Sequence, residues 1–195
     1  MYKKLPELIR LLKAREETET VFLVSNGQNP KMLQKLRKES KGKSEKENSL
    51  PTQLYVSMVA PNEKLYKKIT CNKEKNGWKK YLKSLALLKL LPCRTVIRLT
   101  LIKGFNDSQA TMDQFSELLE IVGADFIEIK SYMRLGLSRK RLTEENTPNF
   151  EYTKAFAEKL LSRLSSYKLE SEKISSRIIL LKNRGSKFPT KIIER

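Results

Sequence analysis

Short apolar runs rich in β-branched residues alternate along the chain with segments of helical periodicity, and this alternation constrains the fold more than any other feature. The runs are continuously apolar and show no strict alternation of polar and apolar positions. Strands of that kind are typical of parallel sheets covered by helices. The sequence therefore predicts an α/β fold with parallel strands and outer helices. Strands are expected at residues 20–27, 52–59, 94–102 and 124–130, and helices at residues 5–12, 30–37, 62–69, 77–91, 108–122 and 149–164.

The 195 residues are expected to form a single domain. Near the C-terminus, "YKLES" and "SRIILLKN" predict a final two-stranded β-ribbon. Between Lys31 and Lys46 there are seven basic and two acidic residues. This composition predicts a flexible lysine-rich insertion over residues 38–50, which serves either as a linker or as an arm that contacts phosphates. Residues 184–195 are expected to be a disordered basic tail.

The balance of charge favours a polyanionic partner. Forty Lys and Arg residues stand against 22 Asp and Glu residues, which leaves a net charge of +18. Such a field raises the local concentration of nucleic acid. A lysine-rich surface of the thermophilic kind is the alternative explanation. No apolar run approaches the roughly 20 residues that cross a bilayer, and the start lacks the apolar segment of a secretion signal, so we expect a cytoplasmic protein without a membrane partner.

The absence of histidine and the scarcity of cysteine exclude several kinds of site. A chain with no His contains neither a His–Asp nucleophile dyad nor a His-ligated zinc. The two cysteines, Cys71 and Cys93, are too far apart in sequence for a CxxC metal clip. An iron–sulfur cluster generally requires three or four closely placed thiolates. We therefore expect no metal site in this chain by itself, and we expect both cysteines to be packing or surface thiols.

Polar and cationic residues follow the ends of the predicted strands. Because the carboxyl ends of parallel strands meet at one edge of a sheet, these residues are expected to form one site. Carboxylates are scarce among them, so the site should prefer an anionic or polar ligand. The set consists of Ser25, Asn26, Gly27, Asn29, Ser57, Arg98, Thr100, Lys103, Asn106, Lys130, Tyr132 and the run "YMRLGLSRKRLT".

Six segments, taken together and in order, resemble the archaeal tRNA 4-demethylwyosine synthases, which are radical S-adenosylmethionine (SAM) enzymes of wyosine-base formation. The segments are "VFLVSNGQNP", "TQLYVSMVAP", "RTVIRLTLIKGFN", "ADFIEIKSYM", "LGLSRKRLT" and "SRIILL". Each segment alone is weak, but their common order extends over most of the chain. The resemblance implies a partial (β/α) barrel of the radical-SAM type, with the C-terminal ribbon added to it.

Members of that family carry a CxxxCxxC cluster loop after the first strand and a GEP-like motif after the second. The second motif leads into a helix like "KKLPELIRLL", which stands here at residues 3–12. The resemblance therefore implies an N-terminally truncated barrel, the C-terminal portion without the cluster-binding half. A gene split into two polypeptides is the favoured explanation, and an isolated domain or a wrongly assigned start are the alternatives. The exposed first strand edge would then require a partner, because unpaired edges invite aggregation.

The resemblance also implies roles for single residues. Ser25, Asn26, Ser57, Arg98 and Thr100 match positions that hold SAM in radical-SAM enzymes, and hydroxyl, amide and guanidinium groups are suitable donors for its carboxylate. The alternatives are that residues 25–27 only turn the chain and that Arg98 pairs with a neighbouring acid. The segment beside the site that faces the tRNA anticodon loop is expected to use Lys130, Tyr132, Arg134, Ser138, Arg139 and Arg141, with Tyr132 stacking on a base.

The function implied is that of half an enzyme. With an N-terminal partner that bears CxxxCxxC and its 4Fe–4S cluster, the chain would condense N1-methylguanosine in tRNA with pyruvate, using SAM. The lysine usually implicated in pyruvate binding lies in the absent half, so Lys130 is expected to act electrostatically. Two alternatives are a tRNA-binding module without catalysis and a degenerate scaffold without affinity for RNA.

Overall fold

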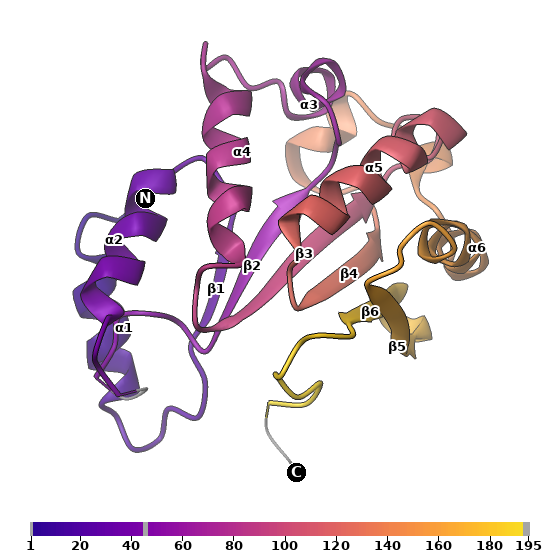
Figure 1. Ribbon diagram of the computed structural model, residues 1–195. Helices are drawn as coiled ribbons and strands as arrows, with labels where there is room; N and C mark the ends of the chain where they lie inside the picture. The colour runs from indigo at the N-terminus through magenta and orange to yellow at the C-terminus, as the bar shows by residue number, and fades with distance from the viewer. Residues whose placement is uncertain (1, 45–46, 193–195) are drawn as a thin grey trace.

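The structure, a computed structural model, describes residues 2–44 and 47–192 and contains one six-stranded mixed sheet (Figure 1). The strand order is β1-β2-β3-β4-β6-β5, so β1 and β5 are the edges of the sheet among the described residues. The predicted parallel strands and the C-terminal ribbon are both confirmed. The parallel strands are β1 (Phe22–Ser25), β2 (Gln53–Met58), β3 (Arg94–Leu101) and β4 (Phe126–Ser131), and β6 (Ile178–Asn183) runs antiparallel to β4 and to β5 (Tyr167–Lys173).

The helices begin where the sequence supplies a capping side chain. Asn29, Asn62, Ser108 and Asn149 each accept a hydrogen bond from the backbone N–H three residues later, which satisfies one of the free donors of a first turn. Gly123 ends one helix in the left-handed conformation, with φ of 57°. The α-helices are α1 (Leu5–Lys13), α2 (Pro30–Ser40), α3 (Glu63–Thr70), α4 (Gly77–Leu88), α5 (Gln109–Val122) and α6 (Phe150–Leu161), and the 3-10 helices are η1 (Gly136–Lys140), η2 (Glu144–Asn146) and η3 (Ile174–Ser176).

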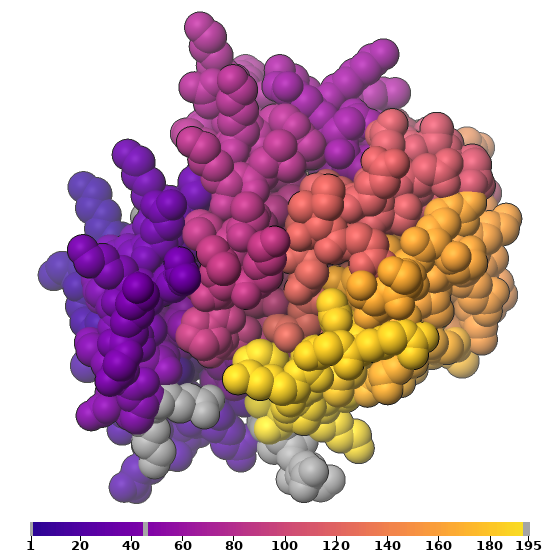
Figure 2. All heavy atoms as spheres, viewed as in Figure 1, coloured from indigo at the N-terminus to yellow at the C-terminus, as the bar shows by residue number. Residues whose placement is uncertain are grey.

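All six α-helices contribute to a core on one face of the sheet. Side chains of successive strand residues point to opposite faces. Leu54, Val56 and Met58 of β2 therefore lie together, and all three are fully buried in the main core with helical residues such as Leu85 and Phe115. In Figure 1, α4 and α5 lie in front of the strands, and the space-filling view from the same side shows their atoms covering the sheet (Figure 2). Among the described residues, no helix is long and apolar enough to cross a membrane.

The opposite face of the sheet carries a smaller apolar cluster, to which no helix contributes a buried residue in the described part of the chain. Tyr55, Val96 and Phe126 form it, with Leu180 and Phe188 packed against them. Phe188 belongs to the predicted tail, and the C-terminal segment runs along the lower edge of the molecule in Figure 1. The Arg94 guanidinium donates to the Thr190 carbonyl at 3.2 Å. Residues 184–192 therefore contact the sheet, while residues 193–195 lie outside the described residues.

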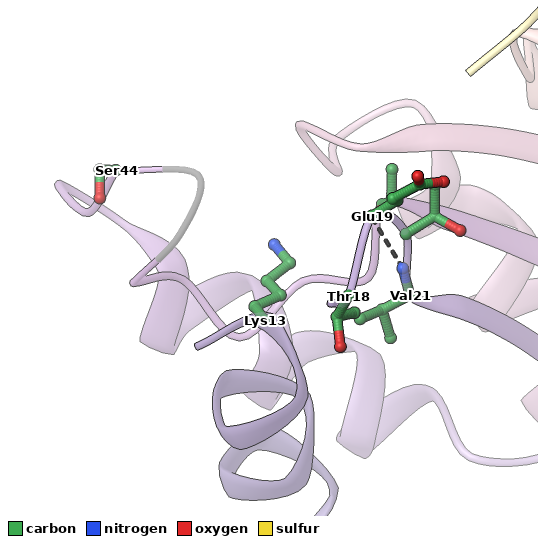
Figure 3. Close-up of a pocket in the computed structure, with 7 residues that line it drawn as sticks. Lys13, Thr18, Glu19, Val21 and Ser44 are labelled. Atoms are coloured by element: carbon green, nitrogen blue, oxygen red, sulfur yellow. Dashed lines mark hydrogen bonds between the residues drawn. The ribbon is translucent and has the colours of Figure 1, made fainter. Parts of the chain in front are cut away.

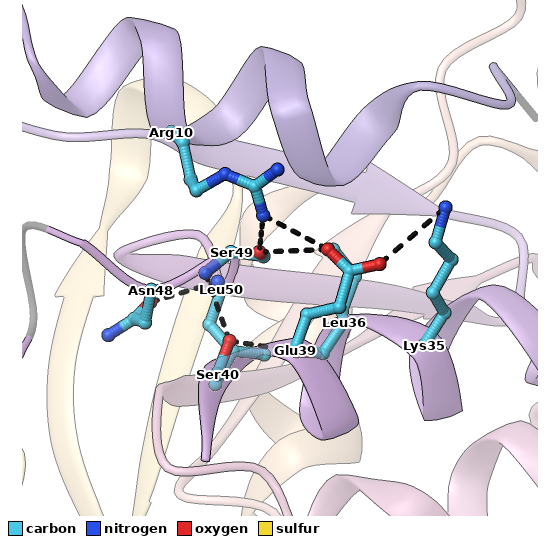
Figure 4. Close-up of polar contacts among 8 residues, drawn as sticks. All are labelled: Arg10, Lys35, Leu36, Glu39, Ser40, Asn48, Ser49 and Leu50. Carbon is cyan, nitrogen blue, oxygen red and sulfur yellow. Dashed lines mark hydrogen bonds and ion pairs between the residues drawn. The ribbon is translucent and has the colours of Figure 1, made fainter. Parts of the chain in front are cut away.

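The lysine-rich segment 38–50 is partly folded into the domain. α2 continues to Ser40, beyond its predicted end at residue 37. The Ser40 hydroxyl accepts from the Ser49 N–H at 3.0 Å, and Leu50 is 1% exposed (Figure 4). Residues 45–46 lie outside the described residues, and mobility of the segment stays a prediction. Its two ends pack against α1 and the sheet because they supply buried apolar and hydroxyl groups.

A polar network joins α1, α2 and the end of this segment. Arg10 donates to the Glu39 carboxylate at 3.0 Å and to the Ser49 hydroxyl at 2.6 Å, and Lys35 lies 3.6 Å from the other Glu39 oxygen (Figure 4). Burial tends to raise the pKa of Glu39, but the Arg10 hydrogen bond and the charges of Lys35 and Arg10 together hold it below its ordinary value of 4.5. Glu39 therefore favours the folded state most strongly when it is ionised.

Glu39→Gln should lower the free energy of unfolding by about 1 kcal/mol at about pH 7, because it removes the charged acceptor of Arg10. The folded-state pKa is below the unfolded one, so this stabilisation is present above about pH 4.5 and is lost as the pH falls through the folded-state pKa. Urea denaturation of both proteins at about pH 7 and about pH 3 measures the difference.

Glu63→Gln is the matched control, since Glu63 pairs with Lys67 on the surface at 2.8 Å, one helical turn away. That pair should contribute only about 0.3 kcal/mol. An equal loss in the two variants, or a Glu39 effect that does not change with pH, would contradict the network described.

Candidate functional site

Four of the predicted site residues lie together on the sheet face that no helix covers in the described part of the chain. This face is called the uncovered face below, and the polar row on it consists of Ser57, Arg98, Thr100 and Lys130. The strand register pairs Ser57 with Arg98, and Thr100 with Lys130. These residues share the face of Tyr55, Val96 and Phe126 because each lies an even number of positions from one of them. Their side chains are half-buried, so they are held by the sheet and still accessible. The predicted convergence at the carboxyl ends of the strands holds for these four positions.

The central polar contact of this face is an ion pair between Arg98 and Glu128. The Arg98 Nε donates to Glu128 Oε1 at 2.6 Å, and its guanidinium lies 4.6 Å from the centre of the Tyr55 ring. Glu128 is 7% exposed, so its carboxylate requires charge compensation, which Arg98 supplies by direct contact and Arg94 by its nearby charge. The alternative of an acid-paired Arg98 is therefore the one that the structure shows. Glu128 was missed by the sequence prediction, which considered strand ends, although the single acid within "FIEIK" was its signal.

A hollow of about 390 Å³ lies on the same face, nearer the amino ends of the strands. Its lining includes Gln53, Tyr55, Arg94 and Glu128. Arg94 donates to Gln53 Oε1 at 2.6 Å and stacks over Phe126 at 4.1 Å, while its buried Nε has no hydrogen-bond partner among the described residues. Burial and the nearby Glu128 charge raise the pKa of Tyr55, which therefore stays a neutral phenol. The hollow thus offers aromatic surface beside a carboxylate and a guanidinium.

Ser25 faces the other side of the sheet. It alternates with Val24, so its side chain lies on the helix-covered side and is 6% exposed. Its hydroxyl accepts from the Gly27 N–H at 3.1 Å, and the exposed Asn26 accepts from the Gln28 N–H at 3.1 Å. Gly27 has φ of 72°, and a Cβ there would lie 2.7 Å from the Tyr81 ring. In this structure residues 25–27 turn the chain, and a role of Ser25 or Asn26 in holding SAM stays a prediction.

Several predicted tRNA contacts hold the loop after β4 in shape. The Tyr132 ring is 7% exposed and packs with Ile102 and Leu142. Its hydroxyl donates to Ser138 Oγ at 2.7 Å, which anchors η1. Arg134 donates to the Leu142 carbonyl at 3.1 Å. The covered ring does not present a face to a base here, so stacking by Tyr132 is absent from this arrangement.

The outer residues of that loop remain accessible. Arg139 and Lys140 of η1 are exposed, and so is Arg141, which follows η1. The Arg141 guanidinium donates to the Ile69 carbonyl at 3.1 Å and lies 3.0 Å from Cys71 Sγ. These side chains supply positive charge at the edge of the sheet where β3 and β4 end. Phosphate contacts by Arg139 and Arg141 stay predictions that the geometry permits.

The cysteines do not fit an iron–sulfur cluster. Cys71 is exposed after α3, whereas Cys93 is buried before β3. Burial raises the pKa of Cys93 to about 12, so its sulfur is a thiol and a poor metal ligand. Among residues 2–44 and 47–192, no three Cys, Asp or Glu side chains are grouped so as to hold a metal. No cluster chemistry can be assigned to these residues.

A second cavity, of about 480 Å³, lies before the amino end of β1 (Figure 3). Lys13, Glu19 and Ser44 line it, and the Val21 N–H donates to Thr52 Oγ1 at 2.9 Å in its wall. None of the predicted site residues borders this cavity. The uncovered face of the sheet is therefore the better candidate site.

The fold places the chain in the class of mixed α/β proteins, with a polar row near the carboxyl ends of its parallel strands. Comparison with known proteins shows which proteins it resembles. The family model described as wyosine base formation matches residues 122–183. The chain is 39% identical over 162 residues to the S-adenosyl-L-methionine-dependent tRNA 4-demethylwyosine synthase of Pyrococcus horikoshii, covering 83% of this chain and 44% of that protein. Against the Methanocaldococcus jannaschii synthase it is 36% identical over 192 residues, covering 98% of this chain and 55% of the relative.

The fold agrees with the sequence. A solved structure of TYW1 with a lysine–pyruvate adduct bound superimposes with a TM-score of 0.78 at 34% identity, covering 95% of this chain and 53% of that one. The chain is therefore a relative of the tRNA 4-demethylwyosine synthases, which confirms the resemblance found in the sequence. It spans about half the length of the relatives it matches.

Replacing Arg98 should destabilise the sheet more than neutralising Glu128. Arg98→Met removes the cation in contact with a 7% exposed carboxylate and should lower the free energy of unfolding by about 2 kcal/mol. Glu128→Gln keeps a neutral acceptor and should lower it by about 1 kcal/mol. Urea denaturation provides both values.

Lys67→Met is the control, because its pair with Glu63 is exposed on α3 and should contribute only about 0.3 kcal/mol. A loss for Arg98→Met no larger than for this control would show that Glu128 has another compensating partner.

Proposed function

We propose that this chain forms part of a SAM-dependent tRNA 4-demethylwyosine synthase, completed by a second polypeptide that carries the CxxxCxxC motif and its 4Fe–4S cluster. Together they would condense N1-methylguanosine in tRNA with pyruvate. The observation that carries the proposal is sequence identity of 36% over 98% of this chain to a synthase of that name, at a TM-score of 0.78 to a TYW1 fold. The poor fit of Cys71 and Cys93 to a cluster supports a second source of cysteines.

The free edge of β1 supports docking of further strands. β1 has a neighbour on one side only within the described residues, and Phe22 and Val24 are 47% and 48% exposed on the uncovered face. Phe22 already contacts Tyr55 edge-to-face at 4.6 Å between ring centroids. A strand added to this edge would satisfy the backbone groups of β1 and bury these side chains. In the proposed complex, the sheet continues beyond β1 into a radical-SAM barrel and its uncovered face becomes the barrel interior.

The polar row then lines the site of the proposed reaction. Ser57 and Thr100 offer hydroxyl groups, and Lys130 offers a cation, to the carboxylate of SAM. Glu128, held by Arg98, offers a carboxylate oxygen to hydroxyl groups of a ribose. SAM would supply the radical chemistry once it is bound beside the partner's cluster. The residues of this chain orient the cofactor and exclude water from the face.

Reconstitution tests the proposal directly. The purified chain is mixed with an N-terminal half bearing CxxxCxxC, then with iron, sulfide, SAM, pyruvate, reductant and tRNA that contains N1-methylguanosine. Mass spectrometry of the digested tRNA should detect 4-demethylwyosine with both halves and none with either half alone. Failure to form product while the chain still binds tRNA would instead favour a tRNA-binding module. Absence of both would leave a scaffold without affinity for RNA.

Ser57→Ala should weaken SAM binding by the reconstituted complex about fivefold, the effect of one lost hydrogen bond of about 1 kcal/mol. Ser162→Ala is the matched control, because Ser162 is an exposed serine at the end of α6. This substitution should leave the affinity for SAM unchanged. Equilibrium dialysis with labelled SAM measures both dissociation constants. Equal affinities for wild type and Ser57→Ala would exclude the serine from the cofactor site.

A further inference from the structure

A groove of about 940 Å³ opens between the first turns of α2 and α4, beside the carboxyl end of β1. Its lining combines amide side chains from the β1–α2 turn with four lysines and one acid. The lysines are Lys31, Lys79, Lys80 and Lys83, and the acid is Glu74. None of these side chains belongs to the polar row of the candidate site.

The groove carries uncompensated positive charge. Glu74 is paired with Lys80. Lys31, Lys79 and Lys83 are exposed, and none of the three forms a salt bridge with a described residue. Lys79 and Lys83 stand one helical turn apart on the same side of α4, so their stems lie about 6 Å from each other. The positive ends of both helix dipoles point to this end of the sheet as well.

Hydrogen bonds join the walls of the groove to one another. Gln28 donates to the Tyr66 hydroxyl at 2.7 Å and to the Gly77 carbonyl at 3.1 Å, which ties the β1–α2 turn to α3 and α4. Asn72 closes the network by donating to Gln28 Oε1 at 3.1 Å. Behind it, Tyr66 stacks on Tyr81 at 5.3 Å between ring centroids. The lysines therefore project from a preformed frame, which limits the entropy lost when they bind a ligand.

The groove and the basic loop after β4 flank the uncovered face from opposite sides. The groove lies beside the end of β1, the first parallel strand in the sheet, and Arg139 and Arg141 follow the fourth. Three strand spacings separate β1 from β4, or about 15 Å. A ligand that reaches the polar row from this end of the sheet would have one cationic surface on each side. An extended polyanion fits that arrangement, whereas a small anion would occupy only one of the two surfaces.

We propose that the groove between α2 and α4 binds the phosphate backbone of the tRNA substrate, on the side of the sheet opposite the loop after β4. This inference rests on the proposed function and adds a second contact surface to it. Lys31, Lys79 and Lys83 each neutralise a phosphate, and the Gln34 and Asn76 amides donate to phosphate or ribose oxygens. Contacts of this kind position the RNA and carry no base specificity.

Salt dependence of tRNA binding tests the groove. The groove variant carries Lys31→Gln, Lys79→Gln and Lys83→Gln. The plot of the logarithm of the tRNA association constant against the logarithm of the salt concentration has a negative slope, and its magnitude should be smaller by roughly 2 to 3 in this variant. Each lost phosphate contact reduces that magnitude by about 0.7 to 0.9. The control variant Lys38→Gln, Lys89→Gln, Lys159→Gln removes the same charge, and its first two lysines lie at the far ends of the same helices. The control slope should stay close to the wild-type value. Filter binding with the full chain over a range of salt concentrations measures each slope.

The outcomes separate the groove from the proposed function. Equal slopes for the groove variant and the control would contradict phosphate binding by the groove. The salt dependence would then come from the net charge of the whole chain. A selective fall of the slope would support the groove even if the reconstituted halves made no 4-demethylwyosine. If the reconstituted halves make product and the groove variant keeps the wild-type slope, the proposed synthase function stands and tRNA binding by the groove is rejected. A wild-type chain without salt-dependent tRNA binding would overturn the groove as well, and product assays would then decide the function separately. Circular dichroism of both variants confirms that each is folded.

Discussion

Alternation of side chains along β2, β3 and β4 is the constraint on which the rest of the structure depends. Every second residue enters the helix-covered core, and the residues between them share the other face. A shift of register by one position would place Arg98 and Glu128 in the apolar core and expose Ile97 and Ile129. The register that buries the aliphatic side chains therefore also aligns the polar row. The same pairing of strands therefore sets both the apolar core and the candidate site.

The uncovered face combines features that a purely structural sheet would avoid. Arg94 is buried with its Nε unpartnered among the described residues, and burial lowers the pKa of its guanidinium. Arg98 and Glu128 form an ion pair in a poorly solvated position, where desolvation offsets much of the attraction. Stacking of the two guanidinium groups on Phe126 and Tyr55 recovers part of that loss. Polar groups in such positions are more readily explained by a ligand than by folding alone.

The order of elements could be predicted from the sequence because each strand is a continuous apolar run between turn residues. The sequence locates the strand ends well, and the structure brings Ser57, Arg98, Thr100 and Lys130 from these ends together on one face. Ser25 also lies at a strand end but points to the other face, because it pairs with Val56 of the core and bonds to its own turn. Tyr132 was predicted to be accessible because a tyrosine in a basic loop resembles a base-stacking residue, but its packing with Ile102 and Leu142 is a tertiary contact without a local signal. Glu128 was missed for the related reason that its importance comes from a neighbouring strand.

The distribution of the net charge of +18 over the surface decides which cations can act on a bound ligand. Many lysines on the far surfaces only add to a long-range field, which screening limits to about 8 Å at physiological salt. Charges that act on a bound RNA must therefore lie within that distance of its phosphates. The lysines between α2 and α4 and the arginines after β4 stand beside the same end of the sheet, and the polar row lies between them. In the proposed complex, an RNA loop held by both surfaces would lie over Thr100 and Lys130, where the register of the strands places the polar row.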